Sequence, residues 1–148
     1  MKFSKYNEGG KFKMTMEKLW ESACCGENDK LKEYYENGGK INRRYKAFGK
    51  NHSLIAGAYR NGNLDTVDLL YKYGERPEAH EMDEIGYIPG YAILIIRTDG
   101  KRQYVPFASK KNAYTIYHSL QRVAVDTMEN IESLAVQCDN VIMEKINY

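Results

Sequence analysis

Residues 60–77, RNGNLDTVDLLYKYGERP, decide the fold of the first half of this chain, because they contain a complete helix with both of its ends. The stretch begins with a Gly-Asn turn and stops at Gly74. The apolar stripe between these ends consists of Leu64, Val67, Leu69 and Leu70. Apolar residues three and four positions apart predict an amphipathic helix, and a glycine just past them is a typical helix stop.

The same pattern occurs once before in the chain. Residues 19–42, LWESACCGENDKLKEYYENGGKIN, superpose on residues 55–77 at a shift of about 36 residues, which predicts a repeat. Gly26 and Gly62 would supply a tight turn between two short helices, with Gly38 and Gly74 just past the second helix. Neither helix pair can bury its apolar stripe alone, so we predict that the two pairs stack.

These residues resemble the ankyrin repeat. GNLDTVDLLYKYGERP is similar to that family's second helix and its exit, and FGKNHSLIAGA stands where the family has Gly-x-Thr-Pro-Leu-His-x-Ala-Ala. Gly49 is kept there, and Asn51-His52 replaces Thr-Pro. Further along the chain, DEIGYIPGYA resembles the opening of a third repeat, with Gly86 and Pro89 at the expected interval and Ala92 beyond them. The resemblance covers about residues 17–92 and implies a short helical stack with protruding finger loops.

After residue 90 the apolar period changes to that of strands. YAILIIRTDGKRQYVPF predicts a hairpin about a turn at residues 98–101, because Asp-Gly between apolar runs is a strong hairpin signal. Residues 109–126 predict a helix with Ser109 as N-cap. Its apolar face would consist of Ala113, Ile116, Tyr117, Leu120, Val123 and Ala124. Residues 131–146 predict two further strands about an Asp139-Asn140 turn.

The predicted fold class is therefore α+β. A short ankyrin-like helical repeat stack, residues 1–90, is capped by a small antiparallel ββαββ module, residues 91–148, that packs on it. No Gly/Ser-rich or Pro-rich linker separates the two parts.

The composition describes an ordinary soluble chain of 148 residues. Hydrophobic residues make up 43%, charged residues 28%, and the formal net charge of +2 gives no overall attraction to nucleic acid or anionic lipid. No apolar run approaches the roughly 18 residues of a membrane span, and the first residues lack the apolar core of a secretory signal. The three cysteines, with Cys24 next to Cys25, favour a reduced compartment. We expect a cytoplasmic protein without membrane contact.

No catalytic or metal-binding pattern emerges from the sequence. Cys24 and Cys25 lack the spacing of a zinc site, and we expect both to be buried structural cysteines. A Cys25–His52 dyad would lack an orienting partner. The carboxylates of residues 75–84 lack the ligand order of a calcium loop and predict a solvated acidic loop. We expect no catalytic residue, no metal and no cofactor.

The candidate binding site is the basic and aromatic stretch GGKINRRYKAFGKN, residues 38–51. Arginine and tyrosine are enriched in interface hot spots, and arginine pairs bidentately with carboxylates. The ankyrin resemblance implies finger contacts from Arg43, Arg44, Tyr45, Lys46 and Phe48, and first-helix contacts from Trp20, Cys24, Tyr59 and Arg60. The partner would be a protein with an acidic surface.

The expected function is non-catalytic protein binding by occlusion or tethering, as an inhibitor or adaptor. A small viral or microbial inhibitor of a host or defence enzyme is the narrower form of this hypothesis. Three alternatives stay open. The finger, residues 40–50, could bind nucleic acid by base stacking beside its cations; its aromatic rings could instead fold back onto the stack; and the chain could form a homodimer through an uncovered edge of the C-terminal sheet.

Overall fold

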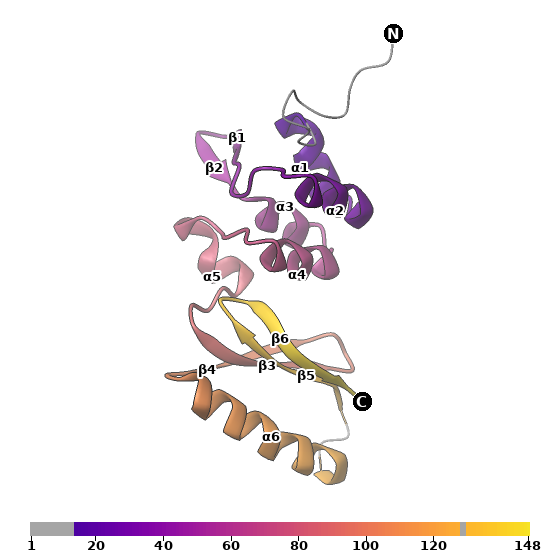
Figure 1. Cartoon of the computed structure of the whole chain (residues 1–148), viewed down its shortest axis with the longest axis vertical. Coiled ribbons are helices and arrows are strands. Elements are labelled where there is room, and N and C mark those ends of the chain that lie inside the picture. Colours follow the sequence, from indigo (N-terminus) through magenta and orange to yellow (C-terminus); the bar gives the residue numbers. More distant parts are fainter. Residues whose placement is uncertain (1–13, 128–129) are drawn as a thin grey trace. The chain divides into compact units, whose positions relative to one another are not determined.

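The structure is a computed structural model that describes residues 14–127 and 130–148, without the side chains of residues 123–129 (Figure 1). It shows an α+β fold, as predicted, with two antiparallel sheets. The chain divides into two compact units, Met1–Ile85 and Gly86–Tyr148. The boundary therefore lies a few residues before the one expected after residue 90, and the two units are described separately.

The first unit contains two helix pairs with a β-hairpin between them. The pairs are α1 (Met16–Cys24) with α2 (Asn28–Glu36), and α3 (Leu54–Arg60) with α4 (Leu64–Lys72). The hairpin consists of β1 (Tyr45–Ala47) and β2 (Lys50–His52). After α4 come a short 3₁₀ helix, η1 (Ala79–Glu81), and α5 (Met82–Ile85).

The two helix pairs turn and end in the same way. Gly26 and Gly62 have φ of +70° and +75°, and Gly38 and Gly74 have φ of +84° and +100°. A side chain at these left-handed positions would cost roughly 1 kcal/mol. The same backbone hydrogen bonds surround both sets: Glu27 N to Ser22 O, Asn63 N to Ala58 O, Gly39 N to Tyr34 O, and Glu75 N to Leu70 O. The helix pair therefore recurs in the structure at the spacing seen in the sequence.

The core of the first unit is made of the inner faces of these helices. Val67 and Leu70 of the predicted stripe are buried, whereas Leu64 and Leu69 are half-buried. The largest fully buried side chains of this unit are Tyr34, Tyr71, Leu19, Leu31, Leu54, Ile55 and Leu70. In α3 every residue from Leu54 to Ala58 is buried, and the last three of them are small.

The second unit has the strand and helix order that the sequence predicts. Its strands are β3 (Tyr91–Arg97), β4 (Arg102–Phe107), β5 (Ile131–Cys138) and β6 (Val141–Asn147), and α6 (Lys110–Thr127) lies between β4 and β5 in the chain. The sheet order is β4-β3-β5-β6, all antiparallel. Figure 1 shows α6 along one face of this sheet. There Tyr117 packs with Ile93, Ile95, Ile131, Leu134 and Val136.

Two sequence predictions about these segments are wrong. Gly86 follows α5 directly, and Ala92 lies within β3, so no third repeat opens at residues 83–92. Ile116, predicted on the apolar face of α6, is 41% exposed, because α6 packs on the sheet through Tyr117 and its neighbours Tyr114 and Leu120 instead. The predictions for Val123 and Ala124 lie outside the described side chains.

The outer strands of the sheet carry features that discourage pairing with another chain. β4 contains Pro106, which has no amide hydrogen to donate, and the pairing of β6 with β5 shifts register after Val136. Proline and strand irregularities are known ways of protecting a sheet edge. A homodimer through this edge stays a prediction without structural support.

The turn between β5 and β6 holds the segment that precedes β3. Asp139 and Asn140 have φ of 49° and 60°. The side chain of Asn140 is almost fully buried and makes three hydrogen bonds: its Oδ1 accepts from Ile88 N at 2.9 Å and Gln137 Nε2 at 3.0 Å, and its Nδ2 donates to Gly86 O at 3.1 Å. Asn140 thus provides hydrogen-bond partners both for polar groups of the turn and for backbone groups of the segment beside it.

We predict that Asn140→Ala lowers the free energy of unfolding by about 2–3 kcal/mol, because buried partners lose their hydrogen bonds. The measurement is urea denaturation of the full chain. Asn140→Gly is the matched control, since glycine tolerates the left-handed backbone but lacks the amide. If the glycine variant unfolds like the unmodified chain, the side-chain hydrogen bonds are not what stabilises this turn.

Candidate functional site

The hairpin in the first unit has a two-residue tip, Phe48-Gly49. In its register Tyr45 lies opposite His52, Lys46 opposite Asn51, and Ala47 opposite Lys50. Both tip residues have positive φ, 52° and 73°, as a type I′ turn requires. Asparagine or aspartate normally fills the first of these positions because a bulky side chain is strained there.

Phe48 is therefore an unusual choice for this turn. The chain uses Asp139-Asn140 at the corresponding turn of the β5–β6 hairpin, where both φ values are also positive. Phe48 gains no packing in return for its strained backbone, since its side chain is 99% exposed. Strained residues in folded proteins concentrate at functional sites. The tip of the hairpin is thus the first candidate for a contact surface.

The base of the hairpin rests on α1 through aromatic stacking. The rings of Tyr45 and Trp20 are stacked, with centroids 4.6 Å apart and planes 10° apart. Trp20 also lies 6.1 Å from the His52 ring. Gly57 of α3 makes room for this packing, because a Cβ there would come within 3.0 Å of both the Trp20 ring and Cys24 Sγ. The Tyr45 ring is consequently not free to stack on a partner by this face.

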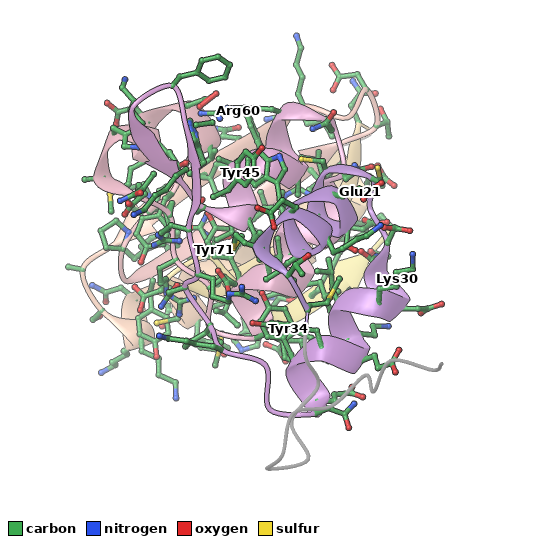
Figure 2. All side chains as sticks on the ribbon, turned by 90° about the horizontal axis from the view of Figure 1, so that it is seen from above. Glu21, Lys30, Tyr34, Tyr45, Arg60 and Tyr71 are labelled. Atoms are coloured by element: carbon green, nitrogen blue, oxygen red, sulfur yellow. The ribbon has the colours of Figure 1, made fainter. Side chains whose placement is uncertain are left out.

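A polar chain of contacts continues from His52 to α5. His52 Nε2 is 3.1 Å from Ala47 O across the hairpin, and His52 Nδ1 is 3.2 Å from Arg60 Nη1. Because a guanidinium only donates, Nδ1 must accept, so Nε2 carries the ring proton. Arg60 then pairs bidentately with Glu84, at 3.0 Å and 2.8 Å. The Glu84 carboxylate raises the pKa of Arg60 further. Figure 2 draws the side chains of the first unit and labels Tyr45 and Arg60.

The two arginines before the hairpin hold backbone carbonyls. Arg43 Nη1 donates to Met14 O at 2.7 Å, and Arg44 Nη2 donates to Arg76 O at 2.9 Å. Arg44 Nε also lies 3.5 Å from a carboxylate oxygen of Glu78. Both side chains are half-buried. The cations that sequence reasoning placed first among partner contacts therefore have partners inside the first unit.

Two carboxylates of the acidic segment are buried, which corrects the predicted solvated loop. Glu81 is fully buried and accepts from Ser53 N at 3.1 Å, Ser53 Oγ at 2.6 Å and Glu78 N at 2.9 Å. Glu75 is also fully buried, and its Oε2 accepts from Tyr35 OH at 2.8 Å and Asn42 N at 2.9 Å. The segment after α4 is thus tied to both ends of the segment that contains the hairpin.

Burial raises the pKa of the Glu75 carboxyl above its ordinary value of 4.5. Hydrogen bonds from Asn42 and Tyr35, and the nearby guanidinium groups of Arg44 and Arg76, act in the opposite direction but do not cancel it. The other oxygen, Oε1, has no hydrogen-bond partner among the described residues. The folded chain therefore favours a protonated Glu75 more than the unfolded chain does.

The cysteines differ from their predicted burial. Cys24 is half-buried and Cys25 is exposed, because Cys25 already belongs to the turn after α1. Burial raises the pKa of the Cys24 thiol, which makes it a poor nucleophile. Both ring nitrogens of His52 already have partners, so His52 offers no free nitrogen as a base for Cys25. Within the described residues, no group of three or more His, Cys, Asp or Glu side chains could hold a metal ion.

The structure separates the candidate residues into three sets. Lys46 and Phe48 are exposed at or near the hairpin tip, and Tyr59 is exposed on α3. Trp20 and Cys24 lie beside Gly57, and Tyr45 stacks on Trp20. Arg43, Arg44 and Arg60 have partners within the first unit. The contacts that His80 makes with the hairpin and that Glu84 makes with Arg60 were not predicted from the sequence. His80 Nε2 lies 2.9 Å from Asn51 O on the hairpin. Because Phe48-Gly49 is not one of the usual type I′ pairs, the sequence carried no clear signal for this hairpin.

No protein-family model, no curated protein and no solved structure matches this chain. The ankyrin resemblance therefore stays a prediction. None of the helices in the described parts of the chain is long and apolar enough to cross a membrane.

We predict that Glu75→Gln flattens the pH dependence of stability. Since the folded pKa is raised, the contribution of Glu75 is complete below pH 4.5 and is lost as pH rises through the raised pKa. The unmodified chain should lose stability over that interval, measured by urea denaturation at several pH values. Glu36→Gln is the matched control, because Glu36 accepts from Tyr73 OH in an exposed setting. Equal slopes for Glu75→Gln and the unmodified chain would contradict the assignment.

Proposed function

We propose that this chain is a non-catalytic protein-binding module that contacts its partner through the tip of the β1–β2 hairpin. One observation carries the proposal: Phe48 is 99% exposed at a backbone position that disfavours its side chain. Selection for folding alone would favour asparagine there. A fully exposed aromatic ring at such a position is best explained by a contact made outside the chain.

The support beneath the hairpin favours the same function. The Trp20–Tyr45 stack, the contacts of His52 and His80, and the buried acceptor Glu75 hold the hairpin at its base and along its strands. A finger that is already ordered loses little conformational entropy when it binds. Two helix pairs with a hairpin between them are also the arrangement that the ankyrin resemblance implies, and members of that family bind proteins with their fingers.

Binding of this kind acts by occlusion or by tethering. A chain of this size can cover a site on another protein, as an inhibitor, or can join two proteins, as an adaptor. In this proposal Phe48, Lys46 and Lys50 touch the partner, and Tyr59 on α3 lies exposed on the same unit. The arginines at positions 43, 44 and 60 hold the finger in place instead of contacting the partner.

A second candidate is single-stranded nucleic acid. The Phe48 ring lies at the tip between two exposed lysines, and base stacking beside cations is a common way to hold single strands. Such binding would weaken steeply with salt, because phosphate contacts release counterions.

We predict that Phe48→Asn separates binding from folding. Removing the strain should raise the free energy of unfolding by about 1 kcal/mol, since the exposed ring makes no packing to lose. Binding should be abolished at the same time. Stability is measured by urea denaturation. Binding is measured by a pull-down from the source cell, in which the unmodified chain should recover one protein in stoichiometric amount.

The double variant Arg43→Glu with Arg44→Glu is the contrasting control. It should lose stability, because both side chains hold carbonyls within the first unit, and any loss of binding should accompany that destabilisation. If Phe48→Asn is fully folded and still retains the captured protein, the hairpin tip is not the contact and the proposed function is wrong.

A further inference from the structure

The residues between Glu36 and Asp65 contain no acidic side chain. Within this segment lie six cations: Lys40, Arg43, Arg44, Lys46, Lys50 and Arg60. The whole chain is almost balanced, with 22 basic and 20 acidic residues. The segment that includes the hairpin is therefore a local basic region, although the net charge of the chain hides it.

Three of these cations are used within the first unit, and three are free to act outside it. Arg43 holds Met14 O, Arg44 holds Arg76 O and lies near Glu78, and Arg60 pairs with Glu84. The remaining cations are lysines, and all three are exposed: Lys40, Lys46 and Lys50. No ion pair within the described residues involves any of them. Their charges are available to a partner.

The hairpin register distributes two of these lysines around the tip. Lys46 lies opposite Asn51, and Lys50 lies opposite Ala47. Since successive residues of a strand point to opposite faces, the Ala47–Lys50 pair and the Lys46–Asn51 pair belong to different faces of the hairpin. Phe48 thus projects from the tip with one cation on each side of the hairpin.

We propose that the partner is a protein whose contact surface is an apolar pocket with carboxylates on two sides. The pocket would take the Phe48 ring, and the carboxylates would pair with Lys46 and Lys50. A protruding ring buries most area in a concave site, and charges at the rim steer association and set orientation. This inference rests on the proposed function and adds the chemistry of the partner to it.

The geometry favours this partner over a nucleic acid or a lipid surface. Single strands are held by several stacking platforms in succession, but Phe48 is the single exposed ring of the hairpin, because Tyr45 is stacked on Trp20. Lysines on opposite faces of a narrow hairpin do not follow one phosphate backbone. One aromatic side chain also buries too little apolar area to anchor a protein on a membrane.

A peptide-display selection on the immobilised full chain tests the inference. The Phe48→Asn variant serves for counter-selection, so that only peptides bound through the tip are kept. We expect enriched peptides to combine an aromatic or aliphatic pair with Asp or Glu on both sides. For a synthetic peptide of this kind, Phe48→Ala should raise Kd about 10- to 100-fold, the effect of losing a buried aromatic side chain.

The lysines give the second arm of the test. Lys46→Gln with Lys50→Gln should weaken the same peptide several-fold and should remove most of its salt dependence. Lys110→Gln with Lys111→Gln is the matched control, because these lysines are also exposed but lie on α6, and it should leave Kd unchanged.

Other outcomes would overturn the inference. In the selection, these are the enrichment of no peptide, or only of peptides without carboxylates. In direct binding assays, these are Phe48-dependent binding of a thymidine oligonucleotide, or of phosphatidylcholine vesicles that contain phosphatidylserine. The proposed function fails separately. Suppose that binding of the cellular partner is lost in Phe48→Asn, but that its Kd changes neither with salt nor with the Lys46→Gln and Lys50→Gln substitutions. The protein-binding function then stands, and only the inferred acidic character of the partner's surface is wrong.

Discussion

The burial of two carboxylates is the constraint on which the first unit depends. Glu81 accepts two hydrogen bonds from Ser53, the residue that caps α3, and Glu75 accepts the amide of Asn42 at the base of the hairpin segment. A buried carboxylate is costly unless its hydrogen bonds are made, and removing its partners is strongly destabilising. The segments around Asn42 and Ser53 are therefore held by hydrogen bonds that are costly to break.

This constraint explains how the hairpin can project without a core of its own. A two-stranded hairpin is marginally stable at best in water. Here its base is tied to Glu75 through Asn42, its face rests on Trp20, and His52 and His80 hold its carbonyls. With the base held in this way, a residue at the tip can keep an unfavourable backbone conformation, as Phe48 does. The strain at Phe48 and the rigidity beneath it belong together.

Local signals account for the parts of the fold that the sequence could predict. The left-handed glycines Gly26 and Gly62 and the Asp139-Asn140 turn depend on the residue itself and its immediate neighbours, and they were predicted correctly. The burial of Glu75 and Glu81 was not predicted, because their partners lie 33 and 28 residues away. The prediction of a third repeat at residues 83–92 was wrong for a related reason. A glycine and a proline at a suitable interval do not determine whether the next apolar run forms a helix or a strand.

The candidate site shows a sharper limit of sequence reasoning, because the same residue types serve inside and outside the first unit. Arg43 and Arg44 look like contact residues by composition, but both hold backbone carbonyls, which carry no side-chain signature in the sequence. Solvation explains the division between the cations. A guanidinium is weakly hydrated and donates in fixed directions, whereas an ammonium is strongly hydrated. Half-buried carbonyls and bidentate carboxylates therefore select arginine, and lysine is retained where the charge stays in water. In a basic segment without carboxylates, the lysines are accordingly the better guide to the outer surface, and the arginines to the framework that supports it.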